Sequence, residues 1–280
     1  PRRWSDYRSE LGEGARWVDG QLIHVDILSG RLLRLSGDQP GDPEVLADGS
    51  LPLGAVAPIA GRPGSWIAAV GHGVARLEND GLEWIAEFGD TDTMRVNDAV
   101  CDPSGRFWLG TMAYANTPGA GCLYRVDADG SVSKVLSGLT IPNGPAFSPD
   151  GTRMYLASSS EARVDVYPVD VGSGELGPPE TFVQLEPELS PDGMTVDGDG
   201  HLWTAIWDGA AVHRYRPDGT LDRVLSLPTP RPTSCCFGGP GLRRLFVTTA
   251  SLDLDDDAAG AVYAFDLDIT GRPAAAFRPR

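Results

Sequence analysis

Apolar residues occur in short runs along the whole chain, and each run is bounded by Gly, Asp, Pro or Ser. Short runs in which apolar and polar residues alternate are typical of half-buried β-strands. No stretch has the length or the periodicity of a long helix. The 35 glycines and 23 prolines are spread through the sequence and supply turns between the strands. The pattern therefore predicts an all-β protein.

A turn followed by a short apolar or aromatic strand recurs along the chain. Its copies lie at residues 14–25, 64–69, 102–109, 148–156, 197–205 and 238–247. Successive copies are roughly 40 to 48 residues apart, which is the period of a four-stranded propeller blade. The repeat predicts a six-bladed β-propeller that occupies residues 1–280 as one domain.

Further strands with alternating apolar and polar residues lie between these copies. They occur at residues 121–127, 164–170, 211–219 and 261–267, and each ends in a turn rich in Asp and Gly. A β-sandwich does not need such a regular period, and a parallel β-helix has a much shorter one. These strands support the propeller as the fold.

Four polar motifs precede apolar strands in different repeats, at residues 11–14, 95–98, 141–145 and 190–194. Chemistry in propellers is usually built at the mouth of the central channel, so we expect these motifs on loops that lead into the innermost strands. Because the motifs occupy equivalent positions, closure of the ring should bring four side chains toward one axis. These side chains are Glu13, Asn97, Asn143 and Asp192.

Asn-Gly and Asp-Gly also form ordinary turns, and we assign that role to Asp150-Gly151 and Asp218-Gly219. The motifs at Asn143 and Asp192 come before the repeat turn. For these two residues, a functional role and an ordinary turn are equally good interpretations. If the four groups converge, their carboxylate and amide oxygens suit Ca²⁺, Mg²⁺ or Mn²⁺, and zinc or iron stays open as a metal with fewer ligands. Asp127 and Asp197 begin Asp-x-Asp-Gly turns that lack the Glu of an EF-hand.

Charge and composition exclude several classes of protein. The 39 acidic residues outnumber the 23 basic ones, which argues against nucleic acid or an anionic membrane as a partner. No apolar stretch approaches the roughly 18 to 20 residues that span a bilayer, and no export signal is visible. We therefore expect a cytoplasmic protein. Motifs of nucleotide cofactors and of serine or zinc hydrolases are missing from the sequence.

Cysteines and histidines are assigned structural roles. The cysteines, which we expect to be reduced and mostly buried, are Cys101, Cys122, Cys235 and Cys236. The histidines, which share no metal-ligand spacing, are His24, His72, His201 and His213.

At its polar motifs the sequence resembles the family of senescence marker protein (regucalcin), gluconolactonases and related sugar lactonases. The resemblance covers nearly the whole chain. It is carried by Leu11-Gly-Glu13, Arg95-Val-Asn-Asp98, residues 102–106 and 110–113, Asn143-Gly144, residues 190–194 and residues 233–239.

The resemblance implies a single metal ion held by Glu13, Asn143 and Asp192, with Asp192 also acting as catalytic acid and base. It implies substrate contacts from Arg95 and Asn97. Animal members continue Gly-Thr-Met-Ala with acidic residues that touch the sugar, whereas this chain continues with Tyr114-Ala115-Asn116. The identity of the substrate sugar therefore stays undecided. Tyr114 either stacks on the sugar ring or narrows the pocket.

The sequence favours a metal-dependent hydrolase that opens a sugar lactone, such as gluconolactone, to the aldonic acid. Calcium is the first choice of metal, with Zn, Mn, Mg and Fe as alternatives, and a monomer is the expected state. Two other functions stay open. One is metal-dependent hydrolysis of other esters or phosphotriesters, and the other is calcium binding without catalysis.

Overall fold

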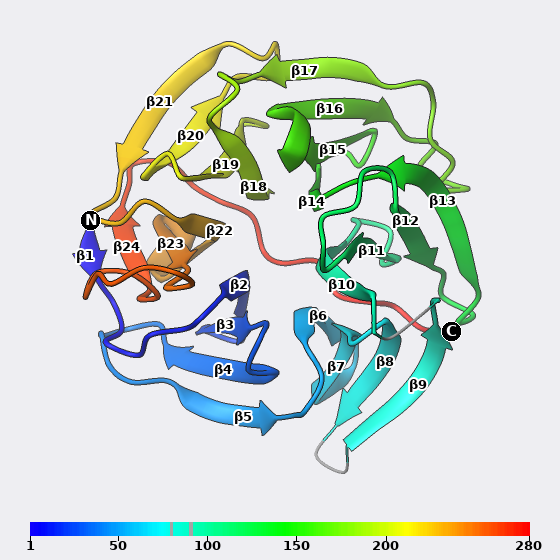
Figure 1. Cartoon of the computed structure of the whole chain (residues 1–280), viewed down its shortest axis with the longest axis horizontal. Helices are drawn as coiled ribbons and strands as arrows, with labels where there is room; N and C mark the ends of the chain where they lie inside the picture. Colours follow the sequence, from blue (N-terminus) through cyan, green and yellow to red (C-terminus); the bar gives the residue numbers. More distant parts are fainter. Residues whose placement is uncertain (79–80, 90–91) are drawn as a thin grey trace.

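The strands of the described residues form six four-stranded antiparallel sheets arranged around a common axis (Figure 1). The computed structural model describes residues 1–78, 81–89 and 92–280. Each sheet is one blade. The prediction of a six-bladed propeller is confirmed.

The first three blades follow the chain without interruption. Blade 1 contains β2 (Gly12–Val18), β3 (Gln21–Asp26), β4 (Arg31–Ser36) and β5 (Glu44–Asp48). Blade 2 contains β6 (Leu53–Ile59), β7 (Arg62–Val70), β8 (Gly73–Glu78) and β9 (Gly81–Glu87). Blade 3 contains β10 (Met94–Cys101), β11 (Phe107–Ala113), β12 (Gly121–Val126) and β13 (Val132–Leu139).

The next two blades have the same plan. Blade 4 contains β14 (Pro142–Phe147), β15 (Arg153–Ser158), β16 (Arg163–Pro168) and β17 (Glu180–Gln184), with the 3₁₀ helix η1 (Ser159–Glu161) after β15. Blade 5 contains β18 (Ser190–Val196), β19 (Leu202–Trp207), β20 (Ala211–Tyr215) and β21 (Leu221–Ser226).

Blade 6 is built from both ends of the chain. It contains β22 (Pro232–Gly238), β23 (Arg244–Thr249) and β24 (Tyr263–Asp266), with η2 (Pro240–Leu242) between the first two strands. The N-terminal β1 (Arg2–Arg3) pairs with β24 and supplies the outer strand. This pairing closes the ring. Of the helices in the described residues, none has the length and apolar character required to cross a lipid bilayer.

The strands nearest the axis are β2, β6, β10, β14, β18 and β22. Each innermost strand contains a shift in its pairing register, which is the mark of a β-bulge. In blades 1, 3, 4 and 5 the shifts fall between Glu13 and Arg16, Val96 and Ala99, Asn143 and Ala146, and Pro191 and Met194. A bulge bends the strand and redirects its side chains. The four polar motifs therefore lie within the innermost strands, at bulges. The prediction that they lie on the loops before these strands was wrong.

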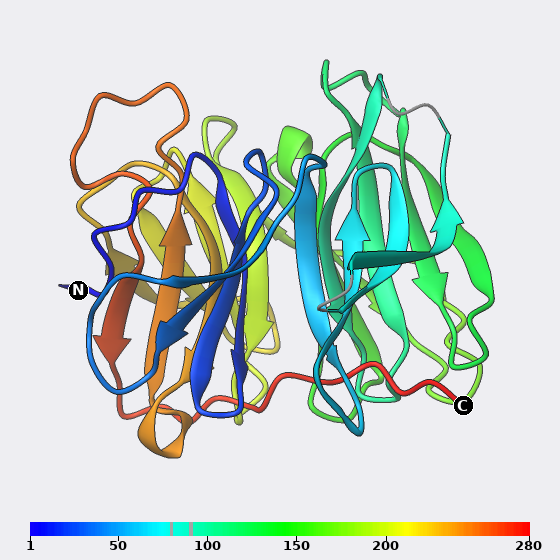
Figure 2. The same cartoon turned by 90° about the horizontal axis from the view of Figure 1, so that it is seen from below.

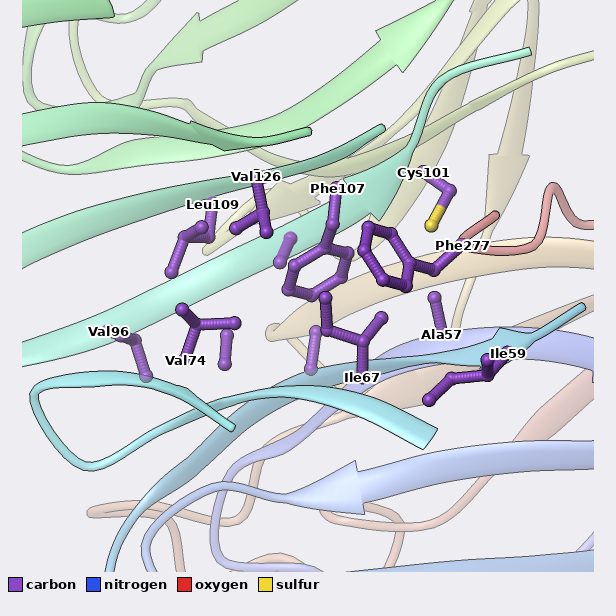
Figure 3. Packing of buried hydrophobic residues seen from close by; sticks show 13 residues of the cluster. Ala57, Ile59, Ile67, Val74, Val96, Cys101, Phe107, Leu109, Val126 and Phe277 are labelled. Atoms are coloured by element: carbon purple, nitrogen blue, oxygen red, sulfur yellow. The ribbon is translucent and has the colours of Figure 1, made fainter. Parts of the chain in front are cut away.

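Residues after β24 cross the lower side of the ring toward blades 2 and 3 (Figures 1 and 2). Phe277 exchanges backbone hydrogen bonds of 2.8 Å with Pro58 and Ala60. Its buried ring packs among apolar side chains of both blades, including Ile59, Phe107 and Val126 (Figure 3). This crossing connects blade 6 to the other side of the ring at the end where the inner strands finish.

Candidate active site

A pocket of about 380 Å³ lies at the end of the ring where the inner strands begin. Its lining includes all the site residues predicted from the sequence, which are Glu13, Arg95, Asn97, Tyr114, Asn143 and Asp192. They come from blades 1, 3, 4 and 5, so residues about 180 positions apart in the chain share one cavity. The prediction that Glu13, Asn97, Asn143 and Asp192 come together is confirmed.

Glu13 and Asp192 form a pair of buried carboxyl groups in this pocket, with exposed fractions of 4% and 6%. The Gly14 N–H donates a hydrogen bond of 2.8 Å to Oε2 of Glu13. Burial, followed by the nearby Asp192 and Asp98, raises the pKa of Glu13 well above its usual range. The pKa of Asp192 is also raised well above its usual range, first by burial and then by Asp98. The pocket thus holds two carboxyl groups whose ionisation is unfavourable unless a cation neutralises them.

A chain of hydrogen bonds orients the two asparagines. Nη1 of Arg95 donates to Oδ1 of Asn97 at 2.7 Å, and Nδ2 of Asn97 donates to Oδ1 of Asn143 at 2.7 Å. Nδ2 of Asn143 then donates to Oγ of Ser159 at 2.9 Å, and that hydroxyl donates to the Pro191 carbonyl at 2.6 Å. The Asn143 side chain lines the pocket, and its amide oxygen, fixed by Asn97, keeps a second lone pair for another partner.

Arg95 brings a buried positive charge to the same pocket. Its side chain also donates a hydrogen bond of 2.9 Å to the Val96 carbonyl. Burial lowers the pKa of Arg95, whereas Tyr114, Glu13 and Asp192 raise it. Tyr114 lies at the rim and is 46% exposed. A guanidinium fixed in this way can donate to the oxygens of a bound ligand.

Asp98 and Arg16 form a buried ion pair beside the pocket, and sequence reasoning gave neither of them a role. Oδ1 and Oδ2 of Asp98 accept hydrogen bonds from the backbone of Ala99 at 2.7 Å and Gly144 at 3.0 Å. Nη2 of Arg16 lies 3.8 Å from Oδ1 of Asp98 and donates to the Ala99 carbonyl. Asp98 thus ties the bulge of blade 3 to that of blade 4. In the sequence, Asp98 stood out as the residue after Asn97 and as the end of the motif Arg95-Val-Asn-Asp98.

Ser159 was also missed, because nothing near it in the sequence marks a site. It lies in η1 and reaches the pocket only because β15 returns to the same end of the ring as β14. Its hydroxyl connects Asn143 of blade 4 to the backbone of blade 5.

The structural roles assigned to the cysteines agree with the structure. All four thiols are free, and Cys101, Cys235 and Cys236 are buried. Burial raises the pKa of Cys236 to about 12, which leaves the thiol protonated and unreactive at neutral pH. Asp127, Asp150 and Asp218 lie in turns, as predicted.

The ligand atoms in the pocket fit a divalent cation that prefers oxygen. The described residues hold no group of three or more His, Cys, Asp and Glu side chains placed to bind a metal, so a metal here needs an amide ligand as well. Two carboxylates whose raised pKa values reflect burial beside like charges, with the Asn143 amide oxygen close by, provide such a set. A hard cation would neutralise this charge.

Comparison with known proteins places the fold and the pocket in context. Residues 11–251 match the family model described as "SMP-30/Gluconolactonase/LRE-like region". The pentonolactonase XacC of Haloferax volcanii is 40% identical over 96% of this chain and 94% of its own length. The L-arabinolactonase of Azospirillum brasilense is 33% identical over 98% of this chain and 94% of its own length.

Among solved structures, a calcium-binding protein, regucalcin, from Agrobacterium tumefaciens superposes with a TM-score of 0.90. It is 30% identical, and the match covers 99% of this chain and 97% of that one. Relatives named as lactonases support a hydrolase activity for this chain. On its sequence and its fold, the chain belongs to the SMP-30/gluconolactonase/LRE-like family.

Proposed function

We propose that this protein hydrolyses a sugar lactone to the corresponding aldonic acid with the help of one divalent metal ion. The observation that carries the proposal is the meeting of two buried carboxyl groups, an oriented amide oxygen and a buried arginine in one pocket. The lactonases among the relatives support the same reaction class.

Glu13, Asn143 and Asp192 are the proposed ligands of the metal. Calcium is the first choice, because the ligand atoms are oxygens and a related structure is titled a calcium-binding protein. Zn, Mn, Mg and Fe are the alternatives. When bound, such an ion would polarise the lactone carbonyl and stabilise the negative charge that develops on its oxygen.

The side chains of the pocket have separate tasks in this proposal. Arg95 and Asn97 orient the lactone by hydrogen bonds to its oxygens. Asp192 accepts a proton from the attacking water, and the new C–O bond forms at the carbonyl carbon. The bond between this carbon and the ring oxygen then breaks, and the ring oxygen takes up the proton from Asp192 as a hydroxyl. The free acid that results releases a proton at neutral pH.

The pocket suits a single sugar ring and its hydroxyl groups rather than a longer chain, given its volume of about 380 Å³. Tyr114 stands at the rim, and the family resemblance implies acidic residues next in the chain of animal members, so the preferred sugar need not be theirs. Two relatives are named for five-carbon lactones. Pentonolactones therefore join gluconolactone in the set of candidate substrates.

The test is proton release from a panel of pentono- and hexonolactones by the metal-stripped protein, before and after Ca²⁺, Mn²⁺, Zn²⁺, Mg²⁺ or Fe²⁺ is added. We expect hydrolysis that depends on added metal. Restored activity on a simple aryl ester or phosphotriester, with none on any lactone, would favour metal-dependent hydrolysis of other esters. Metal binding without turnover would favour a non-catalytic calcium-binding propeller. A monomeric state and a cytoplasmic location stay predictions.

A further inference from the structure

The pocket has two unlike sides. Blades 3 and 4 supply mainly guanidinium, amide and hydroxyl groups, from Arg95, Asn97, Tyr114, Asn116, Asn143, Ser159 and Ser160, and add the apolar side chains of Met112 and Ile141. Apart from the two carboxyl groups and Ser190, the side formed by blades 1, 5 and 6 is apolar. It consists of Leu11, Ile27, Leu28, Trp207 and Leu252. A ligand that fills this pocket meets mostly hydrogen-bonding groups from blades 3 and 4, and it meets mostly hydrocarbon, beside the two carboxyl groups, from blades 1, 5 and 6.

Trp207 is the largest residue of the apolar side, and it is only partly buried. It is the last residue of β19, and its register partner is Ser190 at the start of β18. Its ring packs against the apolar cluster that contains Leu11 and Ile27 of blade 1. The indole therefore lies at the junction of blades 5 and 1 and exposes part of its surface to the pocket.

Arg231 contacts the indole and does not itself line the pocket. Its guanidinium carbon lies 4.9 Å from the centroid of the Trp207 ring, which is the geometry of a cation–π contact. Nε of Arg231 donates to Oδ1 of Asp208 at 2.9 Å, and Nη1 donates to the Leu252 carbonyl. One side chain thus connects Trp207, the turn after it and Leu252, all of which form or flank the apolar side.

The turn after Trp207 is strained in a way that serves this arrangement. Asp208 and Ala210 have φ angles of 60° and 48°, in the left-handed region. Asp tolerates this region, but for Ala it costs about 1 to 2 kcal/mol. The strained turn places the Asp208 carboxylate against Arg231. The conformational cost of the turn is therefore offset by the contacts that fix the indole.

We infer that Trp207 is a specificity-determining residue whose ring receives a C–H face of the lactone, and that Arg231 is the residue that positions it. The inference rests on the proposed function and narrows its substrate class. Sugar rings have faces of C–H groups and edges of hydroxyl groups. The preferred lactone is one that presents a C–H face to Trp207 while its hydroxyl edge meets Arg95 and the amides and hydroxyls of blades 3 and 4.

The test compares Trp207→Ala, Trp207→Leu and Trp207→Phe, with Trp84→Ala as the matched control. Trp84 is a partly exposed indole of β9 that does not line the pocket. Loss of a contact made equally in the ground and transition states raises KM and spares kcat. We expect Trp207→Ala to raise KM about tenfold, which corresponds to about 1.4 kcal/mol. Trp207→Phe should restore most of the affinity, Trp207→Leu should restore less, and Trp84→Ala should change nothing.

Arg231 is tested with Arg231→Ala and Arg231→Lys, because lysine keeps the cation but loses the fork that reaches Asp208 and Leu252 together. A smaller rise in KM than for Trp207→Ala, partly rescued by lysine at constant kcat, supports the positioning role. Each variant is also titrated with a cyclic polyol that lacks the carbonyl and cannot be hydrolysed. An unchanged KM and an unchanged polyol affinity in Trp207→Ala overturn the inference.

The two measurements separate the inference from the proposed function. One outcome is that the wild type binds the polyol but hydrolyses no lactone, and that Trp207→Ala binds the polyol more weakly. This outcome would reject the proposed function and keep the assignment of Trp207. Lactone hydrolysis with unchanged KM in all Trp207 variants would do the reverse. A wild type that neither binds the polyol nor hydrolyses a lactone overturns both.

Discussion

Asp192 lies near the start of β18 and Asp197 directly follows its end, and both aspartates are buried, yet their surroundings differ in kind. Asp197 accepts hydrogen bonds from the backbone of Asp199 and His201 at 3.0 Å and from Nε1 of Trp203 at 2.9 Å. It also accepts two from Arg214, at 2.9 and 2.7 Å. Asp192 instead lies beside the carboxyl groups of Glu13 and Asp98. Burial, followed by the charge of Asp98, raises the pKa of Asp192, although a hydrogen bond with Glu13 lowers it in part.

The difference separates a structural carboxylate from a reactive one. Asp197 closes the turn between the first two strands of its blade, and Asp102 of blade 3 does the same with the backbone of Arg106 and Nε1 of Trp108. The protein itself satisfies these groups. Asp192 is buried beside like charges, and a carboxyl group in that state is available for a metal ion or a proton.

The largest effect is expected for Asp192→Ala. We expect this variant to lose about a thousandfold in turnover, because it removes a proposed metal ligand and the proton acceptor together. The free energy of unfolding of the metal-free protein should not fall, since a buried charge near like charges is removed. Lactonase assays and urea titrations measure the two quantities. Activity within about twofold of the wild type would remove Asp192 from the mechanism.

Asp197→Asn should show the opposite pattern. It leaves Arg214 with a weakened partner in a buried pair, and breaking such a pair costs about 3 to 5 kcal/mol of stability. Turnover per folded molecule should stay near that of the wild type. Urea unfolding with activity measured at low denaturant tests this. A large loss of activity in a stably folded variant would contradict the division of roles.

Metal binding offers a third way to test the comparison. A divalent ion at a hundred times its Kd stabilises the folded state by about 2.7 kcal/mol when one site binds only that state. We expect this gain for the wild type and for Asp197→Asn, and its loss in Glu13→Gln and Asp192→Ala. Thermal unfolding with and without Ca²⁺ or Mn²⁺ measures it. Equal stabilisation of all four proteins would place the metal elsewhere.

His24 extends the comparison to a buried group that is neutral. Burial lowers the pKa of His24 to about 4, so between pH 4 and 6.5 the unfolded chain binds more protons than the folded one. Stability is complete above pH 6.5 and falls as the pH drops. His24→Leu should remove about 2 kcal/mol of the difference in stability between pH 7 and pH 5. Urea titrations of the wild type and of His24→Leu at pH 7 and pH 5 test this. An equal loss of stability in the two proteins between these pH values would count against it.

Much of the site could be found from the sequence because its motifs recur at one position of a repeat. Glu13, Asn97, Asn143 and Asp192 precede the same turn in different blades, and a closed ring makes equivalent positions neighbours. Residues without such a repeat could not be found. Arg16, Ser159 and Trp207 reach the pocket or its surroundings only through bulges and through the meeting of blades that are distant in sequence.

The sequence by itself determined the β-strands, the six repeats and the polar residues of the candidate site, because period, turn residues and motif position are local properties. Only the tertiary structure decided that these residues lie within bulged inner strands, that β1 completes blade 6 and that Phe277 packs between blades 2 and 3. It also decided that Asp197 is surrounded by donors, whereas Asp192 lies beside the carboxyl groups of Glu13 and Asp98. Pairing, packing and burial depend on contacts between distant segments, and no local pattern specifies them.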